Sequence, residues 1–229
     1  MTMTESAKKP FKVAVYCSSR HGSEKVKDSF RKAAEGLAQA FYGKSWGLVY
    51  GGGTKGLMGA VAGTLSNLGG SIDSVRVSAL LDTEGASLYG GPENYGNEIM
   101  CATMHERKAR MEQEADAFVA LPGGFGTLDE FVEIICWSQI NIHSKPIVIF
   151  NIDGFYDPFF ALADKFKDAG MMPEGAEDIY RRANTVEEVI RAIENYEAPS
   201  EGRLKADWSQ KAKVPNPVLG SSASMNNGL

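Results

Sequence analysis

Short apolar runs and amphipathic stretches alternate along most of the chain. The apolar runs predict strands over residues 12–18, 46–51, 71–80, 117–121, 146–152 and near 178–182. Helical spacing of apolar residues predicts helices over residues 24–42, 57–68, 104–115, 128–140, 157–170 and 185–196. Continuously apolar strands are typical of parallel sheets that helices cover on both faces. We therefore predict an α/β fold in which a doubly wound, mostly parallel sheet carries helices on both faces.

This pattern divides the chain into one domain and two ends. Residues 11–197 are expected to form a single domain, preceded by a flexible N-terminus over residues 1–10. Residues 198–229 are polar, with Pro, Ser, Asn and Gly, and predict a flexible tail. Residues 82–98 are rich in turn formers and predict a surface loop. The helix over 128–140 is apolar on nearly every side, so we expect most of its faces to be buried, which is compatible with a subunit interface.

Composition and charge narrow the classes of partner. The 229 residues are 43% apolar and 23% charged, as in ordinary soluble proteins. A net charge of −5 argues against nucleic acid as a partner, since phosphate backbones need clustered Lys and Arg. Cys17, Cys101 and Cys136 form no CxxC pair, so a zinc site and a disulfide framework are not expected, and a cytoplasmic location fits. No apolar run approaches the roughly 20 residues that span a bilayer, so no membrane partner is expected.

Two glycine-rich loops each follow a predicted strand and open a predicted helix. In doubly wound folds, ligands bind beyond the carboxyl ends of the strands, where both loops would lie. The first loop contains Gly51-x-Gly53-x-x-Gly56, which together with Asp73 downstream matches a dinucleotide-binding pattern. However, Asp73 falls early in its strand, and the loop follows the second strand. A dinucleotide site, a mononucleotide phosphate cradle and a plain tight turn therefore all remain open.

The second loop, LPGGFGTLDE over residues 121–130, combines glycines with two acids. Its glycines let the backbone approach an anion closely. Thr127 and Glu130 have the spacing of a capping box, in which both would only stabilise the start of the helix. Alternatively, Glu130 serves a reaction as a base or as a stabiliser of positive charge, because the N-terminus of the helix favours its ionised form.

A charged helix, MHERKARM over residues 104–111, carries the adjacent basic residues Arg107 and Lys108. Adjacent residues diverge by about 100° on a helix, so one can face a site while the other faces solvent or a partner. Glu106 and Arg110 have the spacing of a surface ion pair.

Taken together and in this order, three segments resemble the LONELY GUY (LOG) family. The segments are VYGGGTKGLMG, MHERKARM and ADAFVALPGGFGTLDEFVEIICWSQINIHSKPIVIFNIDGFYD, and the resemblance extends over about residues 11–196. It implies a Rossmann-like homodimer or higher homo-oligomer. The sequence itself shows no metal-ligand cluster and no lysine in a cofactor motif, so neither a metal nor another cofactor is expected. It also implies hydrolysis of the N-glycosidic bond of a small nucleoside monophosphate, a cytokinin riboside 5′-monophosphate, to free base and ribose 5-phosphate. Whether plain AMP is accepted is left open.

The resemblance also implies roles for individual residues. Arg107 and Glu130 match the catalytic residues of the family. The residues that match its substrate-binding positions are Glu84, Lys108, Gly52, Gly53, Gly123, Gly124, Phe125, Gly126, Thr127, Leu128 and Asp129. The chain departs from the family pattern at Ser18 and Ser19, at Thr103, and in the longer loop over residues 82–98, which affects the placement of Glu84.

These roles suggest why a phosphate-type loop ends in carboxylates. The glycine N–H groups would hold the 5′-phosphate, and Glu130 would stabilise the positive charge that develops at C1′, as carboxylates do in glycoside hydrolysis. Three other interpretations remain. They are a non-catalytic nucleotide- or molybdopterin-binding module on the same scaffold, a dinucleotide-dependent enzyme that uses Gly51–Gly56, and the lysine decarboxylase once assigned to this family, for which no cofactor lysine motif is visible.

Overall fold

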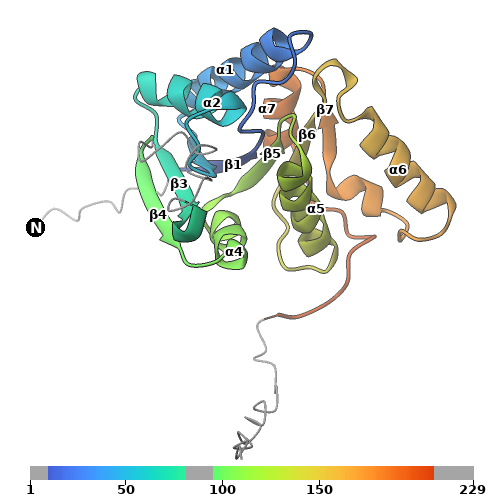
Figure 1. Cartoon of the computed structure of the whole chain (residues 1–229). Helices are drawn as coiled ribbons and strands as arrows, with labels where there is room; N and C mark the ends of the chain where they lie inside the picture. The colour runs from blue at the N-terminus through green and yellow to red at the C-terminus, as the bar shows by residue number, and fades with distance from the viewer. Residues whose placement is uncertain (1–9, 81–94, 209–229) are drawn as a thin grey trace, which may run out of the picture.

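The structure is a computed structural model that describes residues 10–80 and 95–208. One sheet of seven strands crosses the described residues in the order β4-β3-β2-β1-β5-β6-β7 (Figure 1). The strands are β1 (Lys12–Tyr16), β2 (Gly47–Tyr50), β3 (Ile72–Val77), β4 (Asn97–Cys101), β5 (Ala117–Ala120), β6 (Ile147–Phe150) and β7 (Arg181–Ala183). Every neighbouring pair is parallel, which confirms the predicted doubly wound sheet.

Helices cover both faces of this sheet. The α-helices are α1 (Lys27–Gly43), α2 (Gly56–Asn67), α4 (Met104–Glu114), α5 (Phe125–Gln139), α6 (Asp157–Asp168) and α7 (Val186–Glu194). Short 3-10 turns lie at Ser78–Leu80, Ile152–Gly154 and Ala176–Ile179. Helices α1, α2 and α7 pack on one face, and α4 and α5 pack on the other (Figure 1). Among the described helices, none combines the length and the apolar character needed to cross a bilayer.

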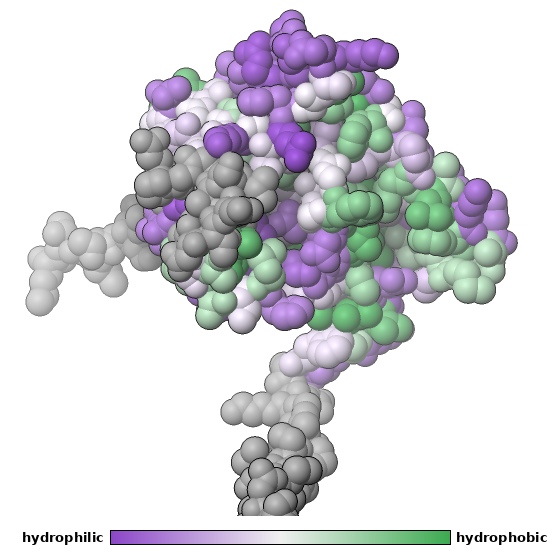
Figure 2. Space-filling model, in the orientation of Figure 1, coloured by the Kyte–Doolittle hydropathy of each residue, from purple (hydrophilic) through white to green (hydrophobic). Residues whose placement is uncertain are grey.

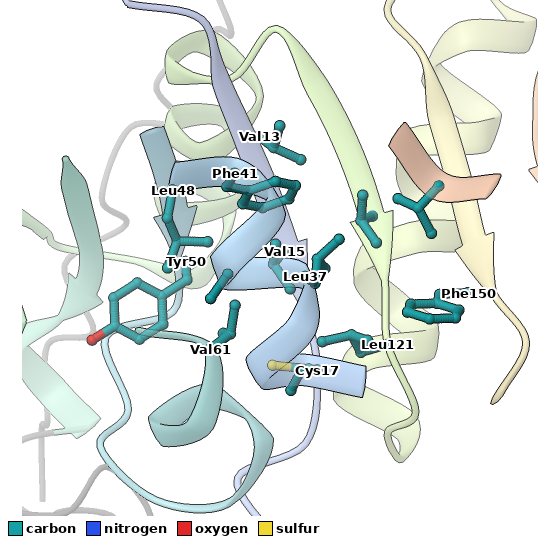
Figure 3. Close-up of a cluster of buried hydrophobic side chains, with 14 of the residues drawn as sticks. Val13, Val15, Cys17, Leu37, Phe41, Leu48, Tyr50, Val61, Leu121 and Phe150 are labelled. Atoms are coloured by element: carbon teal, nitrogen blue, oxygen red, sulfur yellow. The ribbon is translucent and has the colours of Figure 1, made fainter. Parts of the chain in front are cut away.

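Alternation along the central strand divides the core into two layers. Val13 and Val15 of β1 join the layer under α1, α2 and α7, part of which Figure 3 shows. Ala14 and Tyr16 point to the opposite layer, under α4 and α5. Because successive side chains of a strand face opposite sides, a strand buried on both sides must be apolar at every position. This requirement explains why the central strands could be predicted from apolar runs in the sequence.

Strand β4 is the element that the sequence pattern missed. Residues 82–98 were expected to form a surface loop, but Asn97 and Glu98 begin a strand that pairs with β3. Most of β4 is exposed, as expected at the edge of a sheet, so it has no continuous apolar run. Residues 81–94, which include Glu84, lie outside the described residues.

Helix α5 differs from its predicted form in two respects. It begins at Phe125 with Gly124 at the N-cap, so the predicted capping box of Thr127 and Glu130 is wrong. The helix also buries one face rather than most of its faces, since Val132 is 41% exposed while Phe131 is 1% exposed. In the single chain, the opposite face of α5 therefore carries apolar surface in solvent.

The segment after α7 returns to the C-terminal end of α5 (Figure 1). Arg203 donates hydrogen bonds to the carbonyl oxygens of Ser138 (2.9 Å) and His143 (2.5 Å). The Trp208 indole donates to the carbonyl oxygen of Ile140 at 2.8 Å. Residues 198–208, expected to begin a flexible tail, thus include residues with defined contacts. Residues 1–9 and 209–229 lie outside the described residues, and their flexibility stays a prediction.

Candidate active site

A cleft of about 340 Å³ opens beyond the carboxyl ends of β1, β2 and β5, where the sequence placed the ligand. Its lining residues are Val15, Cys17, Ser18, Ser19, Arg20, Gly51, Met58, Met104, Arg107, Gly124, Gly126, Thr127, Asp129 and Glu130. Both glycine-rich loops and the start of α4 contribute residues to the lining of the cleft. The cleft therefore brings together segments that lie far apart in the sequence.

The central feature of the cleft is an ion pair between Arg107 of α4 and Glu130 of α5. Arg107 Nη1 lies 2.7 Å from Glu130 Oε1, and the two side chains are 7% and 11% exposed. Arg107 Nε also donates to the carbonyl oxygen of Val75 in β3 at 3.1 Å. A Cβ at Gly51 would lie 2.3 Å from Arg107 Nη2. The first glycine loop therefore makes room for the guanidinium group.

Two side-chain hydrogen bonds hold the first turn of α4, which carries Arg107. The Thr103 hydroxyl accepts from the Glu106 N–H at 3.1 Å, and the Glu106 carboxylate accepts from the Ala102 N–H at 2.7 Å. Thr103, a departure from the family pattern, is thus the N-cap residue. The predicted surface pair of Glu106 and Arg110 is not formed, since Arg110 pairs with Glu114 at 2.9 Å.

Burial and charge act in opposite directions on Glu130. Burial raises the pKa of the Glu130 carboxyl above its ordinary value, and the adjacent Arg107 guanidinium opposes that rise. Burial also raises the pKa of the Cys17 thiol, and the negative charge of Glu130 adds to this effect. A thiol with a raised pKa is a weak nucleophile. Of these two groups, Glu130 is the one suited to act as a base.

The second glycine loop presents open backbone at the N-terminus of α5. A Cβ at Gly124 or Gly126 would meet nothing within 4 Å, which leaves space for a ligand. A Cβ at Gly123 would lie 2.0 Å from Thr127 Oγ1, so this glycine permits close packing inside the loop. Backbone N–H groups at the start of a helix favour anions. The loop is thus suited to a phosphate group.

The cleft separates the predicted site residues into two groups. Its walls include the predicted residues Arg107, Gly124, Gly126, Thr127, Asp129 and Glu130. The predicted residues that lie beside the cleft without lining it are Lys108, Gly52, Gly53, Gly123, Phe125 and Leu128. Glu84 lies outside the described residues. Arg20, Met58 and Met104 line the cleft without having been predicted. Arg20 lies outside the quoted motifs, and the prediction took only glycines and charged residues from the segments that contain Met58 and Met104.

Lys108 links α4 to α5 instead of facing the cleft. Its Nζ lies 3.1 Å from Asp129 and 3.0 Å from Glu133, and its side chain is 11% exposed. The prediction that adjacent Arg107 and Lys108 point in different directions is therefore confirmed. Lys108 contributes by fixing the position of Asp129 on the wall of the cleft.

Asp73, the acid that the dinucleotide interpretation uses, lies away from the first glycine loop. Asp73 lies near the start of β3, where it forms an ion pair with Lys12 and accepts a hydrogen bond from Asn97 at 3.2 Å. These partners hold the Asp73 carboxylate at the amino ends of the strands, and the cleft lies beyond their carboxyl ends. Gly52 has φ of +81°, and a Cβ there would lie 2.4 Å from Arg76 Cγ. Gly52 lies between the glycines of the dinucleotide pattern, and close packing explains it. Close contacts with Arg107 Nη2 and with the Ser19 backbone explain the pattern's Gly51 and Gly56 in the same way.

Comparison with known proteins decides the family. A family model described as "Possible lysine decarboxylase" matches residues 58–193. The cytokinin riboside 5′-monophosphate phosphoribohydrolase LOG5 of Arabidopsis thaliana is 38% identical over 215 residues, which cover 93% of this chain and 91% of that protein. The chain belongs to the LONELY GUY family. A probable cytokinin riboside 5′-monophosphate phosphoribohydrolase of Oryza sativa subsp. japonica, LOGL1, is 41% identical over 187 residues, or 81% of this chain and 79% of that protein.

Solved structures show the fold of this LONELY GUY family member at greater sequence distance. The Moco carrier protein of Chlamydomonas reinhardtii matches with a TM-score of 0.58 and 18% identity, covering 81% of this chain and 96% of that one. The molybdenum cofactor binding protein of Rippkaea orientalis matches with a TM-score of 0.57 and 18% identity, covering 82% and 98%. At this identity, the likeness concerns the Rossmann-like architecture alone.

Proposed function

We propose that the protein hydrolyses the N-glycosidic bond of cytokinin riboside 5′-monophosphates, which are N6-modified forms of AMP, to free base and ribose 5-phosphate. The observation that carries this proposal is the buried pair of Arg107 and Glu130 in a cleft bordered by the N-terminus of α5. The activity named for the relatives in Arabidopsis and rice supports it. Plain AMP is a second candidate substrate of the same site.

The substrate would be held first by its 5′-phosphate. In this proposal, the N–H groups near Gly124 and Gly126 and the Thr127 hydroxyl bind the phosphate oxygens. Both glycines border open space, and Thr127 lines the cleft. Asp129 and its partner Lys108 would complete this wall. Binding energy from the phosphate, which does not react, then positions the ribose for the chemical step.

Glu130 would carry the chemistry at C1′ of the ribose. The bond between C1′ and the base nitrogen breaks, and its electron pair leaves with the base. The carboxylate of Glu130 stabilises the positive charge on the sugar and takes a proton from the water that adds to C1′. The departing base gains a proton from solvent, so water is the only other reactant. A raised pKa makes Glu130 a stronger base than an ordinary glutamate.

Arg107 would keep that carboxylate ionised and oriented. Without a nearby cation, burial favours the neutral acid, which cannot take the proton. The hydrogen bond from Arg107 Nε to the carbonyl oxygen of Val75 and the bond from Nη1 to Glu130 restrict the guanidinium group at two points. Arg107 is thus assigned to charge balance and geometry around Glu130.

We also propose that the protein is a homodimer or a higher homo-oligomer that works in the cytoplasm. Phe125, Leu128 and Val132 are 91%, 39% and 41% exposed, and their spacing places them on one face of α5. Figure 2 shows apolar surface on this side of the molecule. Val132→Glu should lower the molar mass in light scattering if this face joins subunits. Three free cysteines fit a reducing compartment, which cell fractionation can test.

The deciding experiment is chromatography of products from three substrates. Isopentenyladenosine 5′-monophosphate should give free base and ribose 5-phosphate, and its rate relative to AMP measures the base preference. The unphosphorylated riboside should react far more slowly, because it lacks the group that positions it. If the protein binds the monophosphates but releases no base, a non-catalytic nucleotide- or molybdopterin-binding module becomes the better description.

A further inference from the structure

One positive charge on the wall of the cleft has no counter-charge. Four charged side chains line the cleft, from Arg20, Arg107, Asp129 and Glu130. Arg107 pairs with Glu130 at 2.7 Å, and Asp129 pairs with Lys108 at 3.1 Å. Within residues 10–80 and 95–208, the Arg20 guanidinium has neither an ion pair nor a side-chain hydrogen bond. Arg20 is therefore the cation available to an incoming anion.

The turn that carries Arg20 is held on both sides. The Ser18 N–H donates to the carbonyl oxygen of Pro122 at 3.2 Å, which ties the turn to the loop before α5. The Leu57 N–H donates to the carbonyl oxygen of Ser18 at 3.0 Å, which ties the turn to α2. A Cβ at Gly56 would lie 2.2 Å from the carbonyl carbon of Ser19, so this close approach needs glycine.

A hydrogen bond inside the turn fixes the backbone of Arg20. The Arg20 N–H donates to Ser18 Oγ at 2.9 Å. The backbone of Arg20 is therefore set before any ligand arrives, although its side chain lies at the exposed rim of the cleft. Less conformational entropy is lost when a residue on a fixed backbone binds a ligand.

The position of the turn selects the part of the ligand that Arg20 can reach. The bond from Ser18 to Pro122 brings the turn beside the loop that leads to Gly124 and Gly126. The open backbone of those two glycines and Arg20 border the same cleft. Backbone N–H groups and a guanidinium fork together match the several oxygens of a doubly charged phosphate.

We propose that Arg20 binds the 5′-phosphate of the nucleotide and gives the cleft its preference for phosphorylated ligands over free ribosides. This inference rests on the proposed function only in taking a nucleotide as the ligand. Arg20 is a binding and specificity residue, and the chemical step belongs to Glu130. Neither glycine-rich motif includes Arg20.

Calorimetry with ribose 5-phosphate tests the proposal directly. Arg20→Gln should raise the Kd by roughly 10- to 100-fold. This is the range expected when hydrogen bonds to a charged group are lost. Arg20→Lys should recover part of the loss, since it keeps the charge but loses the fork. The matched control is Lys25→Gln, which removes a charge from the same connection between β1 and α1, away from the cleft. It should leave the Kd near that of the wild type.

Kinetics provide a second measurement that a merely structural role would not reproduce. Arg20→Gln should raise KM for the monophosphate by roughly tenfold while kcat changes little, and should leave the slow reaction of the riboside unchanged. An unchanged Kd for ribose 5-phosphate in Arg20→Gln would overturn the proposal. An equal loss of affinity for ribose 5-phosphate in Lys25→Gln would also overturn it, because the overall positive charge of this region would then explain the effect.

Failure of the proposed function is distinguishable from failure of this inference. If the wild type releases no base but binds ribose 5-phosphate through Arg20, the proposed function is wrong and the phosphate site stands. If base is released normally by Arg20→Gln with an unchanged KM, the function stands and the assignment of Arg20 fails. Thermal unfolding of each variant shows whether its fold is intact before either result is used.

Discussion

The Arg107 guanidinium on α4 meets the Glu130 carboxylate on α5 with 2.7 Å between Nη1 and Oε1. Both side chains are nearly buried, so each charge is stable there mainly because the other is present. Two segments 23 residues apart in the chain are thereby joined at the centre of the cleft. Substitution of either partner changes the protonation and the position of the other.

Glu130→Gln should abolish turnover while ribose 5-phosphate still binds. The amide keeps the size of the side chain but can neither take a proton nor stabilise positive charge, so kcat should fall by roughly 10²- to 10⁴-fold. Base release and calorimetry measure the two effects separately. Glu133→Gln is the matched control, because Glu133 lies on the same helix and pairs with Lys108 outside the cleft. A normal rate in Glu130→Gln would remove this residue from the mechanism.

Arg107→Gln should raise the pKa of Glu130 further. Burial already raises that pKa and the Arg107 guanidinium opposes the rise, so removal of Arg107 leaves the effect of burial less opposed. A ¹³C NMR titration of labelled glutamate carboxyls measures the change. Since the base must be ionised, activity falls as pH decreases through this pKa, and residual activity in the variant should be lost at a higher pH than in the wild type. A pKa equal to or below that of the wild type would contradict the pairing.

The adjacent glycines of the second loop should respond differently to alanine. Gly123→Ala places a Cβ 2.0 Å from Thr127 Oγ1, so it should lower the melting temperature. Gly124→Ala meets nothing within 4 Å in the protein, so the fold should tolerate it. It should still weaken phosphate binding if a ligand approaches this backbone closely. Thermal unfolding measures the stability of both variants, and calorimetry with ribose 5-phosphate measures their affinity for phosphate. If Gly124→Ala binds as tightly as the wild type, the phosphate binds elsewhere.

His143 should make the protein less stable in mild acid. Burial lowers the pKa of His143 to about 4, and neutral imidazole fits a ring that contacts the Ile134 carbonyl oxygen at 3.0 Å and accepts the Lys145 N–H at 3.2 Å. The unfolded chain binds this proton near pH 6.5 and the folded chain only near pH 4, so stability falls as pH decreases between these values. The loss should approach about 3 kcal/mol. Denaturant unfolding at pH 7 and pH 4.5 measures it, and His143→Gln should reduce the difference.

The sequence was most informative where one physical requirement dominates. Central strands such as β1 must be apolar at every position, and their pattern located them. Strand β4 was missed because an exposed edge strand is not under that requirement. The motifs identified Arg107 and Glu130, and the divergence of adjacent helical residues separated Arg107 from Lys108.

Other parts of the site depend on contacts that a linear pattern does not contain. The spacing of Thr127 and Glu130 satisfies a capping box, yet α5 begins three residues earlier because Gly124 adopts the cap conformation. Arg20 gains importance only because Gly56 admits Ser19 and because Pro122 accepts the Ser18 N–H. No local pattern reports such contacts between separate loops, so the sequence left this turn unexplained.

The position of β1 also bears on how the protein matures during translation. β1 is synthesised before the other described strands, but it lies between β2 and β5 in the middle of the sheet. One wall of the cleft can form when β2 pairs with β1, whereas Glu130 arrives only with the later segment β5–α5. A nascent or prematurely terminated chain that lacks this segment would have Arg107 without its carboxylate. In the proposed mechanism, incomplete products would therefore lack the base that hydrolysis of a nucleotide needs.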